Sequence, residues 1–266
     1  MKIYISADIE GITGVTHWNE TDLEKRDSAA FREQMTAEVQ AACEGAVSAG
    51  ASEILVKDAH DTGRNIIASK LPKEARLIRG WSGHPFGMMQ ELDESFYAVI
   101  MVGYHSRAGA ETSPLAHTMA GSIVYGIKLN DRNASEFLLN AYAAGLARVP
   151  VVFVSGDKGL CDEVNTLNSN IGTAAVKEGI GSSTVSIHPE IAVARIREGV
   201  AKALKRDVAK CLIRLPNHLV VEIRYKNHFS AYKASFYPGA VLKEPFVVRF
   251  ETDDYFEALR LLLFTI

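Results

Sequence analysis

The chain has little of what marks several large classes of protein. Its three cysteines, Cys43, Cys161 and Cys211, are widely spaced and odd in number. They form no metal-binding cluster by themselves, and they indicate a reducing compartment. No apolar run approaches the length of a membrane span, so we expect no membrane partner. The formal net charge of −3 provides no basic field for binding nucleic acid.

Several common enzyme motifs are also missing. The glycine-containing segments 11–14 and 179–183 match neither the P-loop nor the dinucleotide-binding fingerprint, which argues against a fold that binds ATP or NAD. The chain contains no G-x-S-x-G elbow and no H-E-x-x-H helix. Its first residues enter an apolar, strand-like run without a signal-peptide pattern, so we expect a cytoplasmic location.

The remaining composition is that of an ordinary globular protein, with 266 residues of which 47% are hydrophobic. In the first part of the chain, short runs rich in Val and Ile alternate with longer amphipathic stretches. We expect strands at residues 2–7, 53–57, 97–103 and 151–154, and helices at residues 28–49 and 133–148. This alternation predicts an α/β fold with a doubly wound, mostly parallel sheet.

The pattern changes after about residue 155. His188 and Pro189 suit an N-cap followed by proline at the first helical position, which predicts a helix to about Lys205. Other expected elements are a helix at 162–168, strands at 171–176, 218–225 and 245–252, and a closing helix at 254–264. We therefore expect an α/β domain at residues 1–155 and a smaller α+β domain at residues 156–266.

Three expected strands end in residues that can bind a metal ion. Asp8 and Glu10 follow the first strand, His60 follows the second, and His105 follows the strand that ends at about residue 103. In open α/β sheets, ligands bind just beyond the carboxyl ends of the strands. The four side chains are therefore expected to meet at one edge of the sheet. Oxygen and imidazole ligands suit Zn²⁺ and similar ions, so the first domain is predicted to bind metal.

Each of these residues also has a simpler structural interpretation. Asp8 and Glu10 would share one face if the strand continued through them, but they could equally be solvated loop residues. A histidine that follows a strand, such as His60 or His105, more often caps or hydrogen-bonds than binds metal. The coincidence of three such strand ends is what favours the metal.

Two further residues are ambiguous. Glu136 fits a capping box with Asn133 as the N-cap, or it completes the metal site. His117 is either a buried, hydrogen-bonded histidine or the acid/base or oxyanion-stabilising group that a metal hydrolase needs. Asp58 and Asp61 either orient His60 or begin a helix.

Several motifs together resemble those of the zinc-dependent D-aminopeptidases. The resemblance begins with the S-x-D-x-E-G pattern of residues 6–11. It continues through residues 57–60, 103–106, 116–118, 133–136, 155–157 and 176–179, which include Asp58, Asp157 and Lys177. Each motif alone is weak, but their order and spacing together are specific and cover most of the chain.

The resemblance implies a specific site, activity and assembly. It implies two zinc ions per subunit, with Asp8 as the bridging carboxylate and the other ligands being Glu10, His60, His105 and Glu136. It makes His117 the catalytic histidine. Members of the family form a decamer of two stacked five-membered rings, and they release N-terminal D-amino acids from short peptides, notably D-Ala-D-Ala.

The expected mechanism is hydrolysis of the N-terminal peptide bond by metal-bound hydroxide. His117 would stabilise the oxyanion or carry a proton to the leaving amine. One alternative is a dinuclear hydrolase of another amide or of a phosphoester, for which Arg64, Arg107 or Lys177 would bind the phosphate. A second alternative is a non-catalytic, metal-stabilised, ring-forming protein that binds a small ligand.

Overall fold

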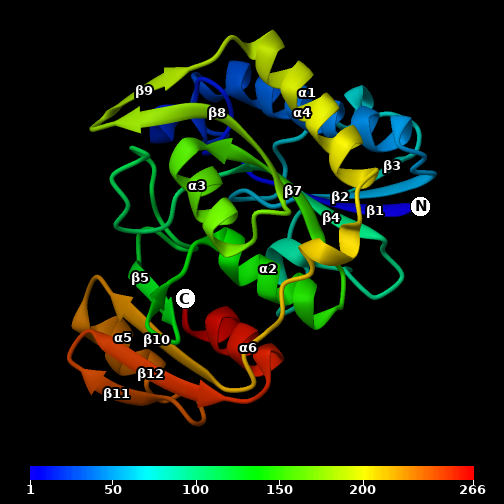
Figure 1. Ribbon diagram of the computed structural model, residues 1–266. Coiled ribbons are helices and arrows are strands. Elements are labelled where there is room, and N and C mark those ends of the chain that lie inside the picture. The colour runs from blue at the N-terminus through cyan, green and yellow to red at the C-terminus, as the bar shows by residue number, and fades with distance from the viewer.

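The computed structural model describes residues 1–266, and its strands form two sheets (Figure 1). The larger sheet has the order β3-β2-β1-β4-β7-β8-β9. Its strands are β1 (Lys2–Ala7), β2 (Glu53–Asp58), β3 (Ala75–Ile78), β4 (Ala98–Tyr104), β7 (Val151–Asp157), β8 (Gly172–Ile180) and β9 (Ser183–Ser186). All neighbouring strands are parallel except the β8–β9 pair, so the predicted mostly parallel sheet is confirmed.

The smaller sheet is antiparallel and has the order β11-β12-β10-β5-β6. Its strands are β5 (Val124–Leu129), β6 (Arg132–Asn133), β10 (Leu219–Tyr225), β11 (Val241–Glu244) and β12 (Val247–Thr252). The α-helices of the chain are α1 (Ser28–Ser48), α2 (Glu136–Leu146), α3 (Lys158–Leu167), α4 (Pro189–Leu204), α5 (His228–Ala234) and α6 (Tyr255–Thr265). None of these helices has both the length and the apolar character needed to cross a membrane.

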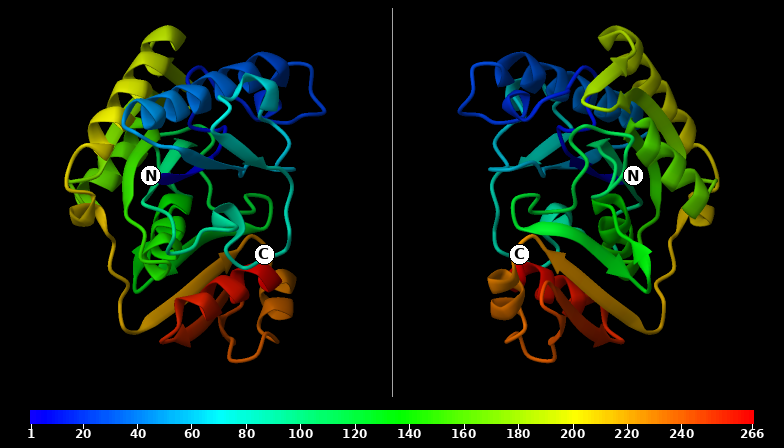
Figure 2. Two further views of the ribbon diagram at one scale, coloured as in Figure 1. Left: turned by 90° about the vertical axis from the view of Figure 1, so that its right-hand side faces the viewer. Right: turned by 90° about the vertical axis from the view of Figure 1, so that its left-hand side faces the viewer.

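The central strands of the larger sheet are covered on both faces. Every residue of β4 and β7 is buried, as expected for parallel strands between two layers of helix. α1 and α4 pack together on one face, and α2 lies on the other (Figures 1 and 2). Gly45 allows the close approach of α1 to α4, because a Cβ there would lie 2.4 Å from the carbonyl oxygen of Arg197.

The smaller sheet lies on the α2 side of the molecule, with α6 between the two parts (Figure 2). The Tyr255 hydroxyl of α6 donates a hydrogen bond of 2.7 Å to the carbonyl oxygen of Leu139 in α2. The Tyr255 ring also meets Tyr142 edge to face, with the centroids 5.5 Å apart. These contacts hold the smaller sheet beside the larger one.

The two sheets draw on interleaved parts of the chain. β5 and β6 precede residue 155 but belong to the smaller sheet, where β5 pairs with β10 and β6 pairs with β5. β8 and β9 follow residue 155 and continue the larger sheet from β7. The division into domains at residues 155 and 156 therefore stays a prediction. The helix expected at 162–168 begins earlier, at Lys158, because the Asp157 side chain caps it.

Candidate metal centre

Three neighbouring strands bring the expected ligands together. β1 lies between β2 and β4 in the sheet, and all three run in the same direction. Asp8 and Glu10 follow β1, and His105 comes directly after β4. His60 follows β2 by two residues. All four side chains are buried. His60 lies close to both acids, and His105 lies close to Asp8, so the four side chains meet at one edge of the sheet as predicted.

Asp8 and Glu10 lie in the loop that follows β1 and are not members of a strand. β1 ends at Ala7, and the chain then turns with a hydrogen bond of 2.8 Å from the Gly11 amide to the carbonyl oxygen of Gly103. A Cβ at residue 11 would lie 1.8 Å from the carbonyl oxygen of Tyr104. Glycine is therefore required beside Glu10, and the turn brings both acids into the interior instead of leaving them in solvent.

Glu136 is not part of the expected capping box. The N-cap of α2 is Ser135, whose hydroxyl accepts a hydrogen bond of 3.1 Å from the Leu138 amide, and Asn133 lies in β6. Glu136 is the first residue of the helix, so its side chain is free to point into the site. Its Oε1 accepts a hydrogen bond of 2.7 Å from the Met119 amide.

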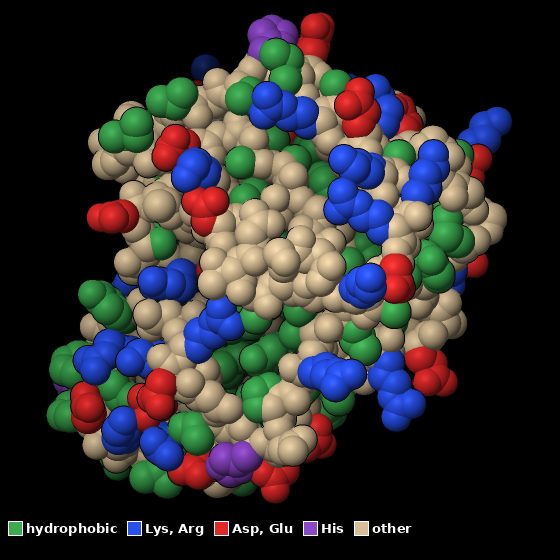
Figure 3. All heavy atoms as spheres, viewed as in Figure 1, with side chains coloured by type: hydrophobic (Ala, Val, Ile, Leu, Met, Phe, Trp, Pro, Cys, Tyr) green, Lys and Arg blue, Asp and Glu red, His purple; other side chains and the backbone are tan.

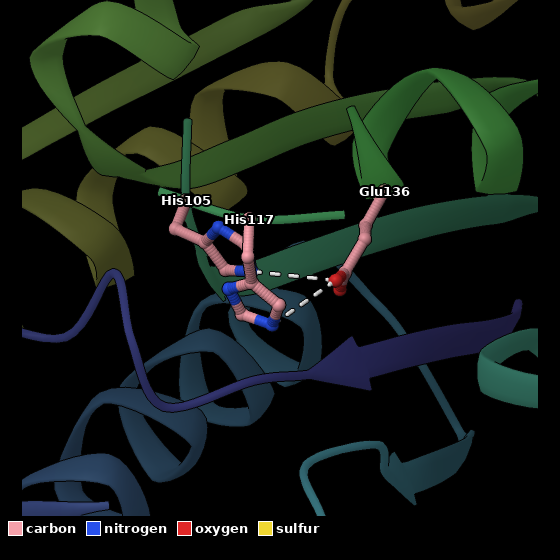
Figure 4. Close-up of side chains that lie close together, drawn as sticks. All are labelled: His105, His117 and Glu136. Atoms are coloured by element: carbon pink, nitrogen blue, oxygen red, sulfur yellow. Dashed lines mark ion pairs between the residues drawn. The ribbon is translucent and has the colours of Figure 1, made fainter. Parts of the chain in front are cut away.

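His117 comes from the long loop between β4 and β5 and lies against His105 and Glu136 (Figure 4). Its ring stacks on that of His105, with the centroids 4.2 Å apart and the planes 7° apart. Its Nε2 lies 3.5 Å from Oε1 of Glu136 and 4.0 Å from Oε1 of Glu10. Of the three histidines it has the most exposed side chain, at 14%.

The six side chains form two groups, Asp8 with Glu10 and His60, and His105 with His117 and Glu136. The Asp8 carboxylate joins them: its Oδ1 lies 3.3 Å from Nδ1 of His60, and its Oδ2 lies 3.6 Å from Nε2 of His105. His60 Nδ1 also lies 3.1 Å from Oε2 of Glu10. One carboxylate thus faces both groups.

Each histidine uses one ring nitrogen for a backbone carbonyl and turns the other toward the acids. The carbonyl partners are Thr21 for His60 Nε2 at 3.0 Å, Ser106 for His105 Nδ1 at 2.9 Å, and Leu115 for His117 Nδ1 at 2.9 Å. Metal-binding histidines are commonly held in this way, because the carbonyl accepts the N–H and fixes the tautomer. The free lone pairs are therefore directed into the site.

The charges of the cluster favour a cation. Burial, with the neighbouring Glu10 carboxylate, raises the pKa of Asp8 well above its usual value. Burial alone would lower the pKa of His60, but Glu10 and Asp8 raise it well above its usual value. Burial alone would also lower the pKa of His105, but the neighbouring Glu136 carboxylate raises that pKa to about 10. In the absence of metal, the acids therefore recruit protons onto the histidines.

Two buried atoms of the cluster without hydrogen-bond partners also fit a bound metal ion. Oε2 of Glu10 and Nε2 of His105 are buried and have no hydrogen-bond partner. Buried polar atoms without partners are rare, because each loses its hydration without compensation. Both atoms belong to the clustered side chains, and both are of the carboxylate or imidazole type that binds Zn²⁺.

Three buried charged residues hold the loops that carry the ligands. Asp58 accepts hydrogen bonds from the amides of Asn65 and Ile66, at 2.6 and 2.7 Å. Asp157 accepts one of 2.7 Å from the amide of Ser106, next to His105. Lys177 donates to the backbone carbonyl oxygens of Glu10 and Val15. Asp58 and Asp157 end strands beside the site, which is the sequence signal that would have assigned them this role.

A cavity of about 950 Å³ opens in front of the site. Glu10, His60 and His117 are among its lining residues. Both tryptophans of the chain, Trp18 and Trp81, also line it. The Trp18 ring meets His117 edge to face, with the centroids 5.2 Å apart, and Trp81 Nε1 donates a hydrogen bond of 2.6 Å to the carbonyl oxygen of Asp61. The site is therefore open to a small molecule and bordered by aromatic walls.

Fold and site define an α/β enzyme whose reactive groups gather beyond the carboxyl ends of parallel strands. The D-aminopeptidase profile of peptidase family M55 matches residues 1–264. The chain belongs to this family of D-aminopeptidases, and it is a peptidase.

Known relatives agree with this assignment along nearly the whole chain. A D-aminopeptidase of Bacillus subtilis (strain 168) is 36% identical over 269 residues, which cover 99% of this chain and 96% of the relative. A solved structure, the Zn-dependent D-aminopeptidase DppA from Bacillus subtilis, described as a self-compartmentalizing protease, superposes with a TM-score of 0.92 at 35% identity. The superposition covers 99% of this chain and 96% of that one.

Proposed function

We propose that the protein is an aminopeptidase with two zinc ions per subunit that cleaves the N-terminal peptide bond of short D-amino-acid peptides such as D-Ala-D-Ala. The observation that carries the proposal is the pair of buried ligand groups joined by Asp8. The zinc dependence of the Bacillus subtilis structure supports the choice of metal. The alternative of a ring-forming binding protein loses its basis, because the family is one of peptidases.

The ligand assignment follows the two groups. Asp8, Glu10 and His60 would hold one ion, and His105 and Glu136 would hold the other together with Asp8. When bound, the two ions supply Lewis acidity and a water nucleophile that is reactive at neutral pH. The free α-amine of a peptide would meet one of the ions or a nearby carboxylate, for which Asp22, Glu24 and Asp61 line the cavity. Recognition of that group makes the enzyme act at the N-terminus of its substrate.

His117 acts in the reaction and not as a zinc ligand. Its side chain is the most exposed of the three histidines and lines the cavity from which a substrate enters. The Nδ1 atom is held by the carbonyl oxygen of Leu115, so Nε2 is the atom that faces the substrate. From this position it stabilises the oxyanion or transfers a proton to the leaving amine.

The assembly that we propose is a decamer of two stacked five-membered rings. The self-compartmentalizing description of the Bacillus subtilis enzyme supports it. Large hydrophobic side chains gather on the surface of the smaller sheet and α5 (Figure 3). Phe229, Tyr232 and Phe236 are 64%, 59% and 71% exposed in the single chain. Exposed patches of this kind mark protein–protein contacts.

A cytoplasmic location stays a prediction from the cysteines, all three of which are free.

The decisive experiment compares D-Ala-D-Ala with L-Ala-L-Ala as substrates of the zinc-loaded protein, with a chelator-treated sample as the control. We expect chelator-sensitive release of D-alanine and no cleavage of the L-peptide. Cleavage of the L-peptide at an equal rate would contradict the proposed stereochemistry. Cleavage that persists without metal would contradict the role of zinc.

A further inference from the structure

The ring of His117 has close neighbours on several sides. One face stacks on His105, with the planes 7° apart, and Nδ1 lies 2.9 Å from the carbonyl oxygen of Leu115. Gly121 also lies against the ring, because a Cβ there would come within 3.3 Å of Cδ2 of His117. Trp18 meets the ring edge to face, with the centroids 5.2 Å apart. The second side-chain torsion of a histidine has broad energy wells, so such neighbours decide where Nε2 points.

Trp18 is the one of these four neighbours that comes from a different part of the chain. The other three lie directly after β4 or in the loop between β4 and β5 that carries His117 itself. Trp18 begins a short 3₁₀ helix, η1 (Trp18–Glu20), in the segment between β1 and α1. Of the four contacts, the one with Trp18 therefore fixes the ring relative to a segment outside its own loop.

The backbone of Trp18 is fixed by hydrogen bonds within its own turn. The Glu20 carboxylate accepts hydrogen bonds of 2.6 and 2.9 Å from the amides of Thr16 and His17. Nδ1 of His17 accepts one of 3.2 Å from the Asn19 amide, which completes a capping box around Trp18. The indole therefore extends from a turn whose conformation does not depend on the loop between β4 and β5.

The same turn also holds His60. The amide and the hydroxyl of Thr21 donate hydrogen bonds of 3.1 and 3.0 Å to the carbonyl oxygen of Trp18. The carbonyl oxygen of Thr21 in turn lies 3.0 Å from Nε2 of His60. Trp18 is thus joined through its backbone to the residue that orients His60, and its side chain contacts His117. This contact sets the position of His117 relative to the His60 side of the metal centre.

We propose that Trp18 is a positioning residue that keeps Nε2 of His117 directed at the scissile peptide bond. This inference rests on the proposed function, in which His117 stabilises the oxyanion or transfers a proton to the leaving amine. Trp18 is 44% exposed and lines the cavity, so its side chain can be removed without opening the hydrophobic core. Without the indole, that side of the imidazole faces the cavity, into which the ring can turn.

The first test is the kinetics of D-Ala-D-Ala hydrolysis by zinc-loaded variants. Trp18→Ala should lower kcat about tenfold and leave KM within about twofold. An edge-to-face contact contributes up to about 1.4 kcal/mol, which changes the population of one ring orientation by that factor. Trp18→Phe retains an aromatic ring and should recover most of kcat. Tyr97→Ala should change neither constant, because Tyr97 is 41% exposed and lies at the end of β4 away from the site.

A double-mutant cycle distinguishes positioning of His117 from direct contact with the substrate. If Trp18 acts through His117, adding Trp18→Ala to His117→Ala should lower kcat no further, and the two losses should not be additive. An equal loss of kcat in both backgrounds would overturn the inference. A rise in KM with unchanged kcat in Trp18→Ala would also overturn it, because Trp18 would then act in substrate binding.

Crystal structures of the zinc-loaded protein and of zinc-loaded Trp18→Ala separate failure of this inference from failure of the proposed function. We expect one orientation of the His117 ring in the unmodified protein and a rotated or divided orientation in Trp18→Ala, with equal zinc content. The same single orientation in both structures would overturn the inference. A displaced ring in Trp18→Ala, together with no cleavage of D-Ala-D-Ala by the unmodified protein, would support the role of Trp18 and overturn the proposed substrate alone.

Discussion

The imidazole rings of His105 and His117 stack in parallel, with their centroids 4.2 Å apart. Nε2 of each ring lies 3.5 Å from the same oxygen of Glu136. His105 is fully covered, whereas His117 reaches the cavity. Two like side chains in contact can therefore divide the work, one holding metal and the other meeting the substrate.

Replacement of His117 tests this division. His117→Ala should retain both zinc ions and lose about 10²- to 10⁴-fold in kcat, the range attributed to a positioned acid or base. Zinc content by elemental analysis and turnover of D-Ala-D-Ala are the two measurements. His84→Ala, at an exposed histidine, is the control. Loss of one zinc ion in His117→Ala would instead make His117 a ligand.

Replacement of Asp8 tests the sharing of one carboxylate. Asp8→Ala removes the group that faces both His60 and His105, so we expect zinc affinity to fall by at least about 100-fold and activity to disappear with it. Zinc titration by a competing chelator measures the effect. Full occupancy of both sites in Asp8→Ala would refute the bridging role.

Gly11 should be intolerant of any side chain. Gly11→Ala places a Cβ 1.8 Å from the Tyr104 carbonyl oxygen, and the resulting strain should lower the free energy of unfolding by about 1–3 kcal/mol or more and displace Glu10. Gly126→Ala is a matched control in β5, since a Cβ there meets nothing within 4 Å. Thermal unfolding measures the effect in both variants. Equal melting temperatures for Gly11→Ala and Gly126→Ala would contradict the close contact between residue 11 and the Tyr104 carbonyl oxygen.

Removal of metal should lower stability. Without zinc, the buried carboxylates of Asp8, Glu10 and Glu136 repel one another unless the histidines take up protons. A ligand present at about 100 times its Kd adds about 2.7 kcal/mol to the free energy of unfolding. Chelation should therefore lower Tm, and added zinc should restore it. An unchanged Tm would show that the metal is not coupled to folding.

The buried ammonium group of Lys57 should make the free energy of unfolding depend on pH in the alkaline range. Burial lowers the pKa of Lys57 in the folded chain to about 8, against about 10.4 when unfolded. Between these values the unfolded chain binds more protons, so the contribution of Lys57 to the free energy of unfolding increases as pH rises from about 8 to about 10.4. Lys57→Met should flatten this increase in urea-unfolding curves measured across that range. Identical slopes would contradict the lowered pKa.

The strand ends were predictable because runs of buried Val and Ile fix where a parallel strand stops, and Asp8, His60 and His105 follow such runs. The role of Glu136 was not settled by local pattern, because the capping box that starts at Asn133 is locally reasonable. The pairing of Arg132 and Asn133 in β6 moves the helix start to Glu136, and this depends on contacts distant in sequence. The membership of β5 in the smaller sheet and of β8 in the larger one was likewise not predictable from local pattern, since strand pairing is non-local.

The placement of both tryptophans at the cavity means that the tryptophan fluorescence of the protein, excited selectively over its tyrosines, reports on one region alone. Trp18 touches His117, and Trp81 lies over the ammonium group of Lys57 at 3.9 Å and is bonded to the loop that carries His60. Zinc loading near the His60 loop should therefore alter the emission of Trp81, and peptide entry next to His117 should alter that of Trp18. The unlabelled chain can serve as its own titration probe, and Trp18→Phe and Trp81→Phe would separate the two signals.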